Sequence, residues 1–121
     1  MLGKVLHPTP AVTKPNTVEQ LLSYSDGLSL CLQEPAQLQE ITTQGMYQLL
    51  LINTVGRAAR GELELARDQR ITWRLEPHDG YMQIAFVGLK PILGQWYVRT
   101  TPEHWCVDVK IRSEQNVLTQ P

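Results

Sequence analysis

An antiparallel sheet is indicated by three stretches of the sequence: Arg-Ile-Thr-Trp-Arg-Leu-Glu at 70–76, Tyr-Met-Gln-Ile-Ala-Phe-Val at 81–87 and Trp-Cys-Val-Asp-Val-Lys-Ile at 105–111. In each stretch, apolar side chains recur at every second position, which is typical of a strand with one buried face and one face in water. Between the first two stretches, residues 76–80 contain Pro, Asp and Gly, which favour a tight turn. The sequence therefore predicts a small antiparallel sheet.

Shorter alternating segments predict further strands at 28–32, 62–65 and 96–100. Residues 46–54 differ because Leu49–Ile52 are consecutive apolar residues. Such a run favours a central strand covered on both faces, with a helix on one side and a second layer or a subunit on the other. A strand at a subunit interface and a buried helix over 45–55 remain open as alternatives.

The N-terminal half carries the signals of a short helix. Thr17 and Gln20 are spaced as in a capping box, in which a side chain at each position satisfies a backbone N–H of the first turn. Val18, Leu21 and Leu22 follow the spacing of an apolar helix face, and Gly27 is a typical C-terminal stop. We expect a helix near 18–25, and a second helical turn over 35–41.

These elements together predict an α+β fold. One or two short N-terminal helices pack on an antiparallel sheet of five to seven strands, which curls into a half-barrel or a sandwich. Residues 1–16, which contain three prolines, form an extended arm. Residues 17–112 form a single domain, and residues 113–121 form a polar tail.

The composition narrows the class of protein. Lys and Arg number 11 and Asp and Glu number 12, giving a formal net charge of −1, which argues against a dedicated binder of duplex DNA. The N-terminal residues do not resemble a secretory signal, and the apolar runs are too short to span a membrane. We therefore expect a soluble cytoplasmic protein in which Cys31 and Cys106 are reduced, with a disulfide between them as the alternative.

Catalytic and metal-binding signals are weak. His104 and Cys106 are two apart and share one face of a strand, which would place a base beside a thiol. Their spacing matches no zinc-ligand pattern, since structural zinc takes four ligands in characteristic pairs. The sequence predicts no metal and no cofactor, and an enzyme with a site near these two residues is only an alternative.

Basic residues recur on the polar faces of the expected strands. If those strands are neighbours, their side chains form a stripe with which a curved sheet could contact single-stranded nucleic acid or a small anionic ligand. The competing interpretation is that they pair with acidic residues on adjacent strands. The residues are Arg57, Arg60, Arg70, Arg74, Arg99, Lys110 and Arg112.

The function favoured by the sequence is that of a non-catalytic interaction module, such as an accessory subunit or an assembly factor. Trp96 and Tyr97 are adjacent on one strand, so one of them must face away from the core, where a large aromatic residue is a typical anchor for a protein partner. Leu50 and Ile52 are the second expected contact, on the doubly apolar segment. The partner is another protein or a second copy of the chain. A small-ligand or single-stranded nucleic-acid binder is the runner-up.

Overall fold

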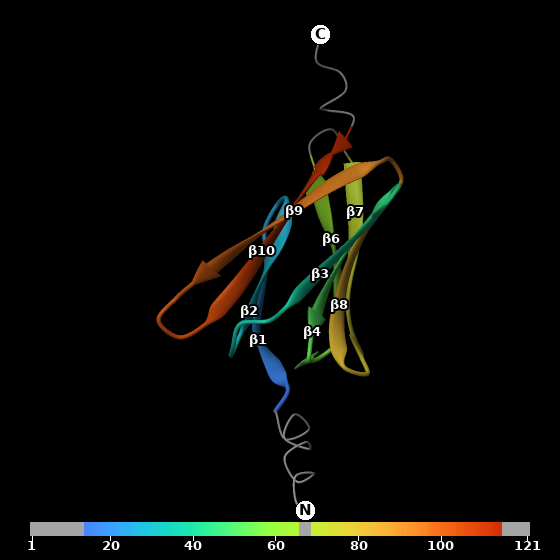
Figure 1. The fold of residues 1–121 in the computed structure, drawn as a ribbon. Coiled ribbons are helices and arrows are strands. Elements are labelled where there is room, and N and C mark those ends of the chain that lie inside the picture. The colour runs from blue at the N-terminus through green and yellow to red at the C-terminus, as the bar shows by residue number, and fades with distance from the viewer. Residues whose placement is uncertain (1–13, 66–68, 115–121) are drawn as a thin grey trace, which may run out of the picture.

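The structure is a computed structural model that describes residues 14–65 and 69–114, and these residues form ten strands (Figure 1). The strands are β1 (Asn16–Ser23), β2 (Gly27–Leu32), β3 (Leu38–Thr43), β4 (Met46–Ile52), β5 (Thr54–Val55), β6 (Ala59–Leu65), β7 (Gln69–His78), β8 (Tyr81–Gly88), β9 (Ile92–Thr100) and β10 (Trp105–Ser113). The stretches predicted from alternation at 70–76, 81–87 and 105–111 are confirmed as β7, β8 and β10.

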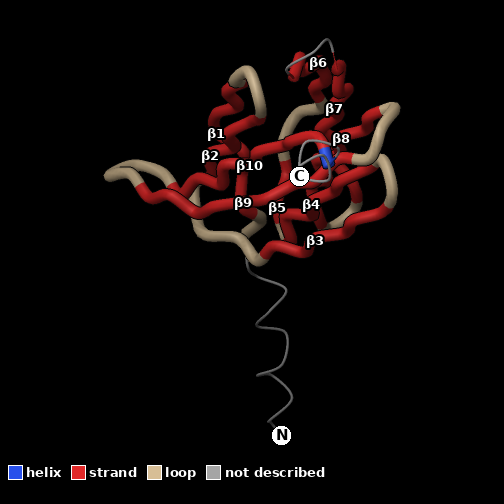
Figure 2. Tube along the Cα trace, turned by 90° about the horizontal axis from the view of Figure 1, so that it is seen from above, coloured by secondary structure: helices blue, strands red, loops and turns tan. Residues whose placement is uncertain are grey.

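The strands form two five-stranded sheets. The first has the order β5-β1-β2-β10-β9 and the second has the order β3-β4-β8-β7-β6. Every pairing is antiparallel except the short contact of β1 with β5. Figure 2 shows the two sheets as separate layers, and the hairpin of β9 and β10 extends beyond them. The architecture is therefore a β-sandwich.

The core lies between the sheets and is built from the inward faces of the central strands. Buried and more exposed residues alternate through β4 and through most of β7 and β8, as expected for strands with one face on the core. β2 and β10 contribute their own alternating apolar residues from the opposite layer. The most deeply buried of these side chains include Leu28, Leu30, Leu32, Leu49, Leu51, Ile84, Phe86, Val107 and Ile111.

The predicted α+β class is wrong, because the segment expected as a helix at 18–25 is β1. A β-bulge between Val18 and Gln20 explains the error. It shifts the register so that Val18 pairs with Leu32 and Leu21 pairs with Leu30, both on the core side. Two apolar residues three apart therefore share one face of a strand, a spacing that otherwise indicates a helix.

The second predicted helical turn, at 35–41, is also wrong. The chain is extended there, and β3 begins at Leu38. Leu38 and Ile41 do not share a face: Leu38 pairs with Leu51, which is in the core, and Ile41 pairs with Gln48 on the outer side. The three-residue spacing of Leu38 and Ile41 therefore places them on opposite faces of one strand, and it does not indicate a helix.

The apolar segment at 46–54 is a strand, so the helical alternative is excluded. β4 lies between β3 and β8 and is central in its sheet. Only one of its faces is fully buried: Tyr47, Leu49 and Leu51 are in the core, whereas Leu50 and Ile52 are half-buried on the outer face. The prediction that a helix covers this face is wrong, because none of the described elements is a helix that packs there.

The terminal segments are only partly described. β1 begins at Asn16 and β10 ends at Ser113. Most of the predicted arm, residues 1–13, and most of the predicted tail, residues 115–121, lie outside the described residues. Among the described residues, no helix has the length and apolar character needed to cross a membrane.

Candidate functional site

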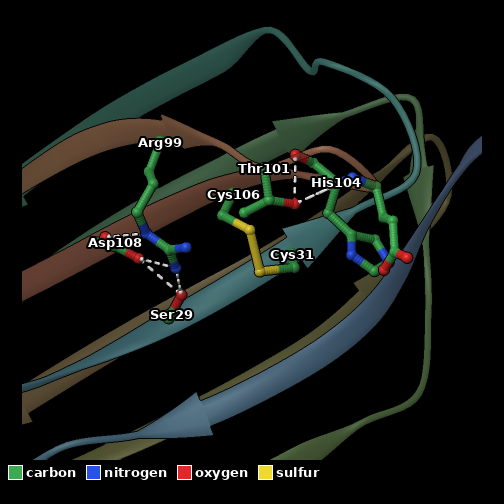
Figure 3. The surroundings of a disulfide bond; sticks show 8 residues. Ser29, Cys31, Arg99, Thr101, His104, Cys106 and Asp108 are labelled. Carbon is green, nitrogen blue, oxygen red and sulfur yellow. Dashed lines mark hydrogen bonds and ion pairs between the residues drawn. A yellow bond between two sulfur atoms is a disulfide. The ribbon is translucent and has the colours of Figure 1, made fainter.

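A disulfide joins β2 and β10 on the outer face of their sheet. Cys31 and Cys106 are direct cross-strand partners and their sulfur atoms are bonded (Figure 3). The expectation of two reduced thiols is therefore wrong. Both cysteines are buried, and a disulfide sulfur is not a thiolate, so Cys106 does not provide the nucleophile that an enzyme near His104 would need.

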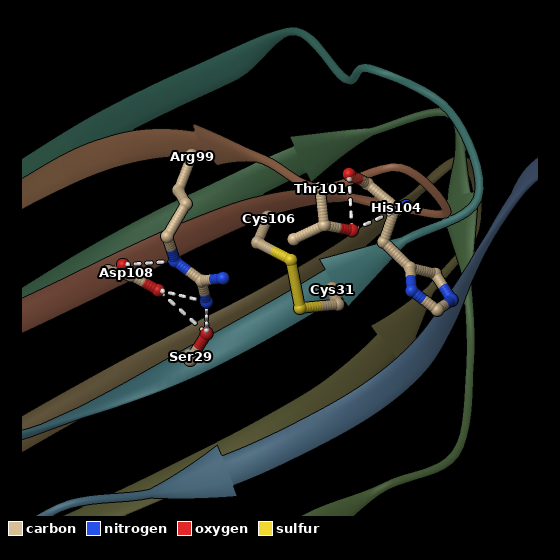
Figure 4. Close-up of polar contacts among 7 residues, drawn as sticks. All are labelled: Ser29, Cys31, Arg99, Thr101, His104, Cys106 and Asp108. Atoms are coloured by element: carbon tan, nitrogen blue, oxygen red, sulfur yellow. Dashed lines mark hydrogen bonds and ion pairs between the residues drawn. A yellow bond between two sulfur atoms is a disulfide. The ribbon is translucent and has the colours of Figure 1, made fainter.

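Beside the disulfide lies a polar network of three residues from three neighbouring strands (Figure 4). Arg99 on β9 donates from Nε to Asp108 Oδ2 at 3.0 Å and from Nη2 to Ser29 Oγ at 2.9 Å. Ser29 on β2 donates to Asp108 Oδ1 at 2.6 Å. Because Asp108 is on β10, between the other two strands, the network ties β9 across β10 to β2.

The network sets the charge state of its acid. The hydrogen bond from Arg99 is the main cause that holds the pKa of Asp108 below its usual range, and the bond from Ser29 acts in the same direction against partial burial. The pKa of Arg99 is raised by the same contact. Asp108 and Arg99 are thus a charged pair, and the positive charge of Arg99 is balanced locally.

Replacement of Asp108 by Asn is expected to lower the free energy of unfolding by about 1 kcal/mol at neutral pH, since the pair is partly exposed to water. The pKa of Asp108 is lower in the folded state, so its contribution is complete above the ordinary aspartate pKa of about 3.9 and is lost as the pH falls through the folded value. Urea unfolding at a series of pH values should show the difference between wild type and Asp108→Asn shrinking in acid. Asp26→Asn, in the exposed turn before β2, is the control, and a constant difference would contradict the assignment.

The tip of the β9–β10 hairpin is held by local hydrogen bonds. Thr101 N–H donates to the carbonyl oxygen of His104 at 2.8 Å, and Thr101 Oγ1 accepts from the N–H of His104 at 2.9 Å. Pro102 and Glu103 complete the two-residue turn. In the described residues, no group of three His, Cys, Asp or Glu side chains is placed to hold a metal ion.

A groove of about 700 Å³ follows this outer face. The residues that line it include the disulfide, Tyr24 from the β1–β2 hairpin and His104 from the β9–β10 hairpin. Arg99 also lines the groove, and its guanidinium is already bonded to Asp108 and Ser29.

The arginines expected to form one stripe are divided between the two outer faces of the sandwich. Arg60 is on β6, and Arg70 and Arg74 are on β7. Arg70 Nε lies 3.9 Å from Glu62 Oε1, and Arg74 Nη1 lies 3.7 Å from Glu76 Oε2. The others on strands are Arg99, Lys110 and Arg112 on the opposite sheet, and Arg57 is in the loop after β5. Arg60 and Arg74 are cross-strand partners, but the structure does not join the seven residues into one stripe.

The two pairs of predicted partner contacts are also separate. Leu50 and Ile52 lie on the outer face of the β4 sheet. Trp96 and Tyr97 lie on β9 at the edge of the other sheet, where they are 39% and 48% exposed. Trp96 pairs with the core residue Val109 on β10. Its side chain is therefore on the inner face of the sheet, the face that packs on the core at Val109. The hairpin of β9 and β10 extends beyond the second sheet (Figures 1 and 2), which is consistent with the exposure of Trp96 on that face.

Three of the four edges of the two sheets are limited in ways that hinder the addition of another strand. β5 has two residues, and β1 beside it contains a bulge and Glu19. β6 carries charged side chains at its centre, and β3 is rich in Gln, Glu and Thr. β9 has none of these features: from Ile92 to Val98 it contains no charged residue, proline or bulge. The edge of β9 is therefore the unprotected one among the described strands.

Val98 and Ser29 were not predicted from the sequence as members of a site. Val98 is 45% exposed on the same face of β9 as Trp96. A signal for it was present, since residues 96–98 are apolar on both faces of a strand. Ser29 and Asp108 could be joined only once the register of β2 and β10 was known.

Comparison of the chain with family models, with curated proteins and with solved structures finds no match.

Proposed function

We propose that this protein is a non-catalytic interaction module that binds a strand of a protein partner along the free edge of β9. The observation that carries the proposal is the contrast between β9 and the other edges: β9 alone is long, unbulged and free of charge from Ile92 to Val98. Strand addition uses backbone hydrogen bonds for affinity and alternate side chains for specificity. Trp96 and Val98 on one face and Tyr97 on the other supply those side chains.

The position of β9 makes its edge accessible. The exposure of Trp96, Tyr97 and Val98 lies between 39% and 48%, although they are large apolar residues. Aromatic residues in such positions are the usual anchors of protein interfaces, since their burial removes a large apolar area from water. The ion pair of Arg99 and Asp108 and the disulfide hold the strands behind this edge, so the edge is a stiff template.

The test compares Val98→Lys with Val87→Lys by native mass spectrometry of complexes purified gently from the protein's own host. The two valines are matched in exposure, at 45% and 44%, but Val87 is on the outer face of β8 in the other sheet. We expect wild type and Val87→Lys to carry the mass of an additional protein chain, and Val98→Lys to lose it. Loss with Val87→Lys alone, or single-chain mass for all three proteins, would overturn the proposal.

The runner-up is a small-ligand binder that uses the groove above the disulfide, and its support is the groove itself. The separation of the arginines on two faces gives no support to a continuous nucleic-acid surface. The cytoplasmic location expected from the sequence stays a prediction. The Cys31–Cys106 disulfide weighs against it, because cytosolic thiols are kept reduced.

A further inference from the structure

The direction of the free backbone groups on β9 follows from its hairpin. Thr101 N–H donates to the carbonyl oxygen of His104, so the backbone groups of this pair point toward each other within the hairpin. In an antiparallel ladder such pairs alternate with pairs whose N–H and C=O point away from each other. Counting back along the strand, Thr100, Val98 and Trp96 direct their N–H and C=O groups toward the free edge.

This edge is complementary to itself. Consider two copies of β9 that run antiparallel about a twofold axis through Tyr97. Trp96 of one copy then lies opposite Val98 of the other, and Gly94 lies opposite Thr100, and each of these pairs has outward-facing backbone groups. Trp96 and Val98 are on the same face of their strand, so an aromatic residue meets a β-branched residue twice, which is a favourable cross-strand combination.

The charges fit the same arrangement. In this register Arg99 lies opposite Gln95 of the other copy, so no like charges meet across the axis. The Arg99 guanidinium is bonded to Asp108, which lies on its own sheet away from the edge. The net charge of the chain is −1, so two copies repel each other little.

We propose that the strand bound by β9 is β9 of a second copy, so that two five-stranded sheets join into one continuous sheet across a twofold axis. This inference rests on the proposed function of β9 as a template for strand addition, and it names the partner. The hairpin of β9 and β10 projects beyond the second sheet (Figure 2). This projection leaves room for the hairpin of a second copy beside it.

The first test is the concentration-dependent mass of the purified protein alone, measured by sedimentation equilibrium. Wild type and Val87→Lys should form dimers of equal affinity. Val98→Lys should weaken the dimer about tenfold or more, because the twofold axis brings two introduced lysines into one interface and removes both Trp96–Val98 contacts. Because Val98 is exposed, its replacement should leave the thermal midpoint of the monomer close to that of wild type, which confirms that the variant is folded.

The second test locates the axis. Tyr97→Cys should form a covalent dimer under mild oxidation, since residue 97 of each copy faces the same residue of the other. Val87→Cys, on the outer face of the other sheet, should form no covalent dimer and serves as the matched control. Equal cross-linking of the two variants would overturn the β9 interface.

The outcomes separate this inference from the proposed function. A protein that is monomeric when purified alone, yet carries a different chain in complexes from its host that Val98→Lys abolishes, would overturn the second copy and leave strand addition standing. A protein that is monomeric in both settings would overturn both.

Discussion

Replacing Cys31 and Cys106 together by alanine is expected to lower the free energy of unfolding by about 4 kcal/mol. The disulfide joins residues 75 apart in the sequence, so it restricts most of the unfolded chain. The chain-entropy model gives about 4.5 kcal/mol for a loop of this length. Strain in the native state usually reduces this stabilisation. For a domain of this size, the thermal midpoint should fall by roughly 15–30 °C.

Thermal unfolding of the wild type and the double variant, each with and without a reducing agent, measures this effect. Reductant should lower the midpoint of the wild type toward that of the double variant and should leave the double variant unchanged. A double variant as stable as the oxidised wild type would show that the cross-link between β2 and β10 contributes little, and that backbone pairing and core packing alone hold these strands together.

Replacing Gly27 by alanine is expected to cost about 3 kcal/mol of folding free energy, as overpacked sites do. A Cβ atom at Gly27 would lie 1.9 Å from the carbonyl oxygen of Val109, a backbone atom that cannot rotate away. β2 would have to separate from β10 at this point, next to the hydrogen bond from Ile111 N–H to the carbonyl oxygen of Asp26. The cost therefore arises from the ladder that holds β10, and with it β9, in place.

Urea unfolding of Gly27→Ala measures this cost, with Ser25→Ala in the same turn as the control. Ser25 is exposed, so its replacement should change the free energy of unfolding by less than about 0.5 kcal/mol. Equal midpoints for the two variants would contradict the close approach of β2 and β10.

The strands were predictable where alternation was regular. β7, β8 and β10 keep one face in the core along most of their length, and their sequences show that directly. The helix expected at 18–25 was wrong because the bulge in β1 gives Val18 and Leu21 a helical spacing while both face the core. The bulge is defined by the pairing of β1 with β2, and the apolar spacing within residues 18–25 does not show that pairing.

The site was predictable only in part. The sequence identified Trp96 and Tyr97 because two adjacent aromatic residues on a strand must face opposite sides. It could not show that β9 is an edge, since the order of strands depends on contacts between distant segments. The same limit applies to Leu50 and Ile52, which proved to lie on a different sheet. It also applies to the arginines, whose division between two faces follows from the topology.

The measurement that tests the account most directly is residue-resolved hydrogen exchange of the β9 amides in the assembled and the dilute protein. If a strand adds to this edge, the N–H groups of Trp96 and Val98 should exchange slowly in the assembly and quickly on dilution. The N–H groups of Tyr97 and Arg99, which point toward β10, should be protected in both. Fast exchange at Trp96 and Val98 in an assembly that protects β3 or β6 instead would contradict the assignment of β9 as the binding edge.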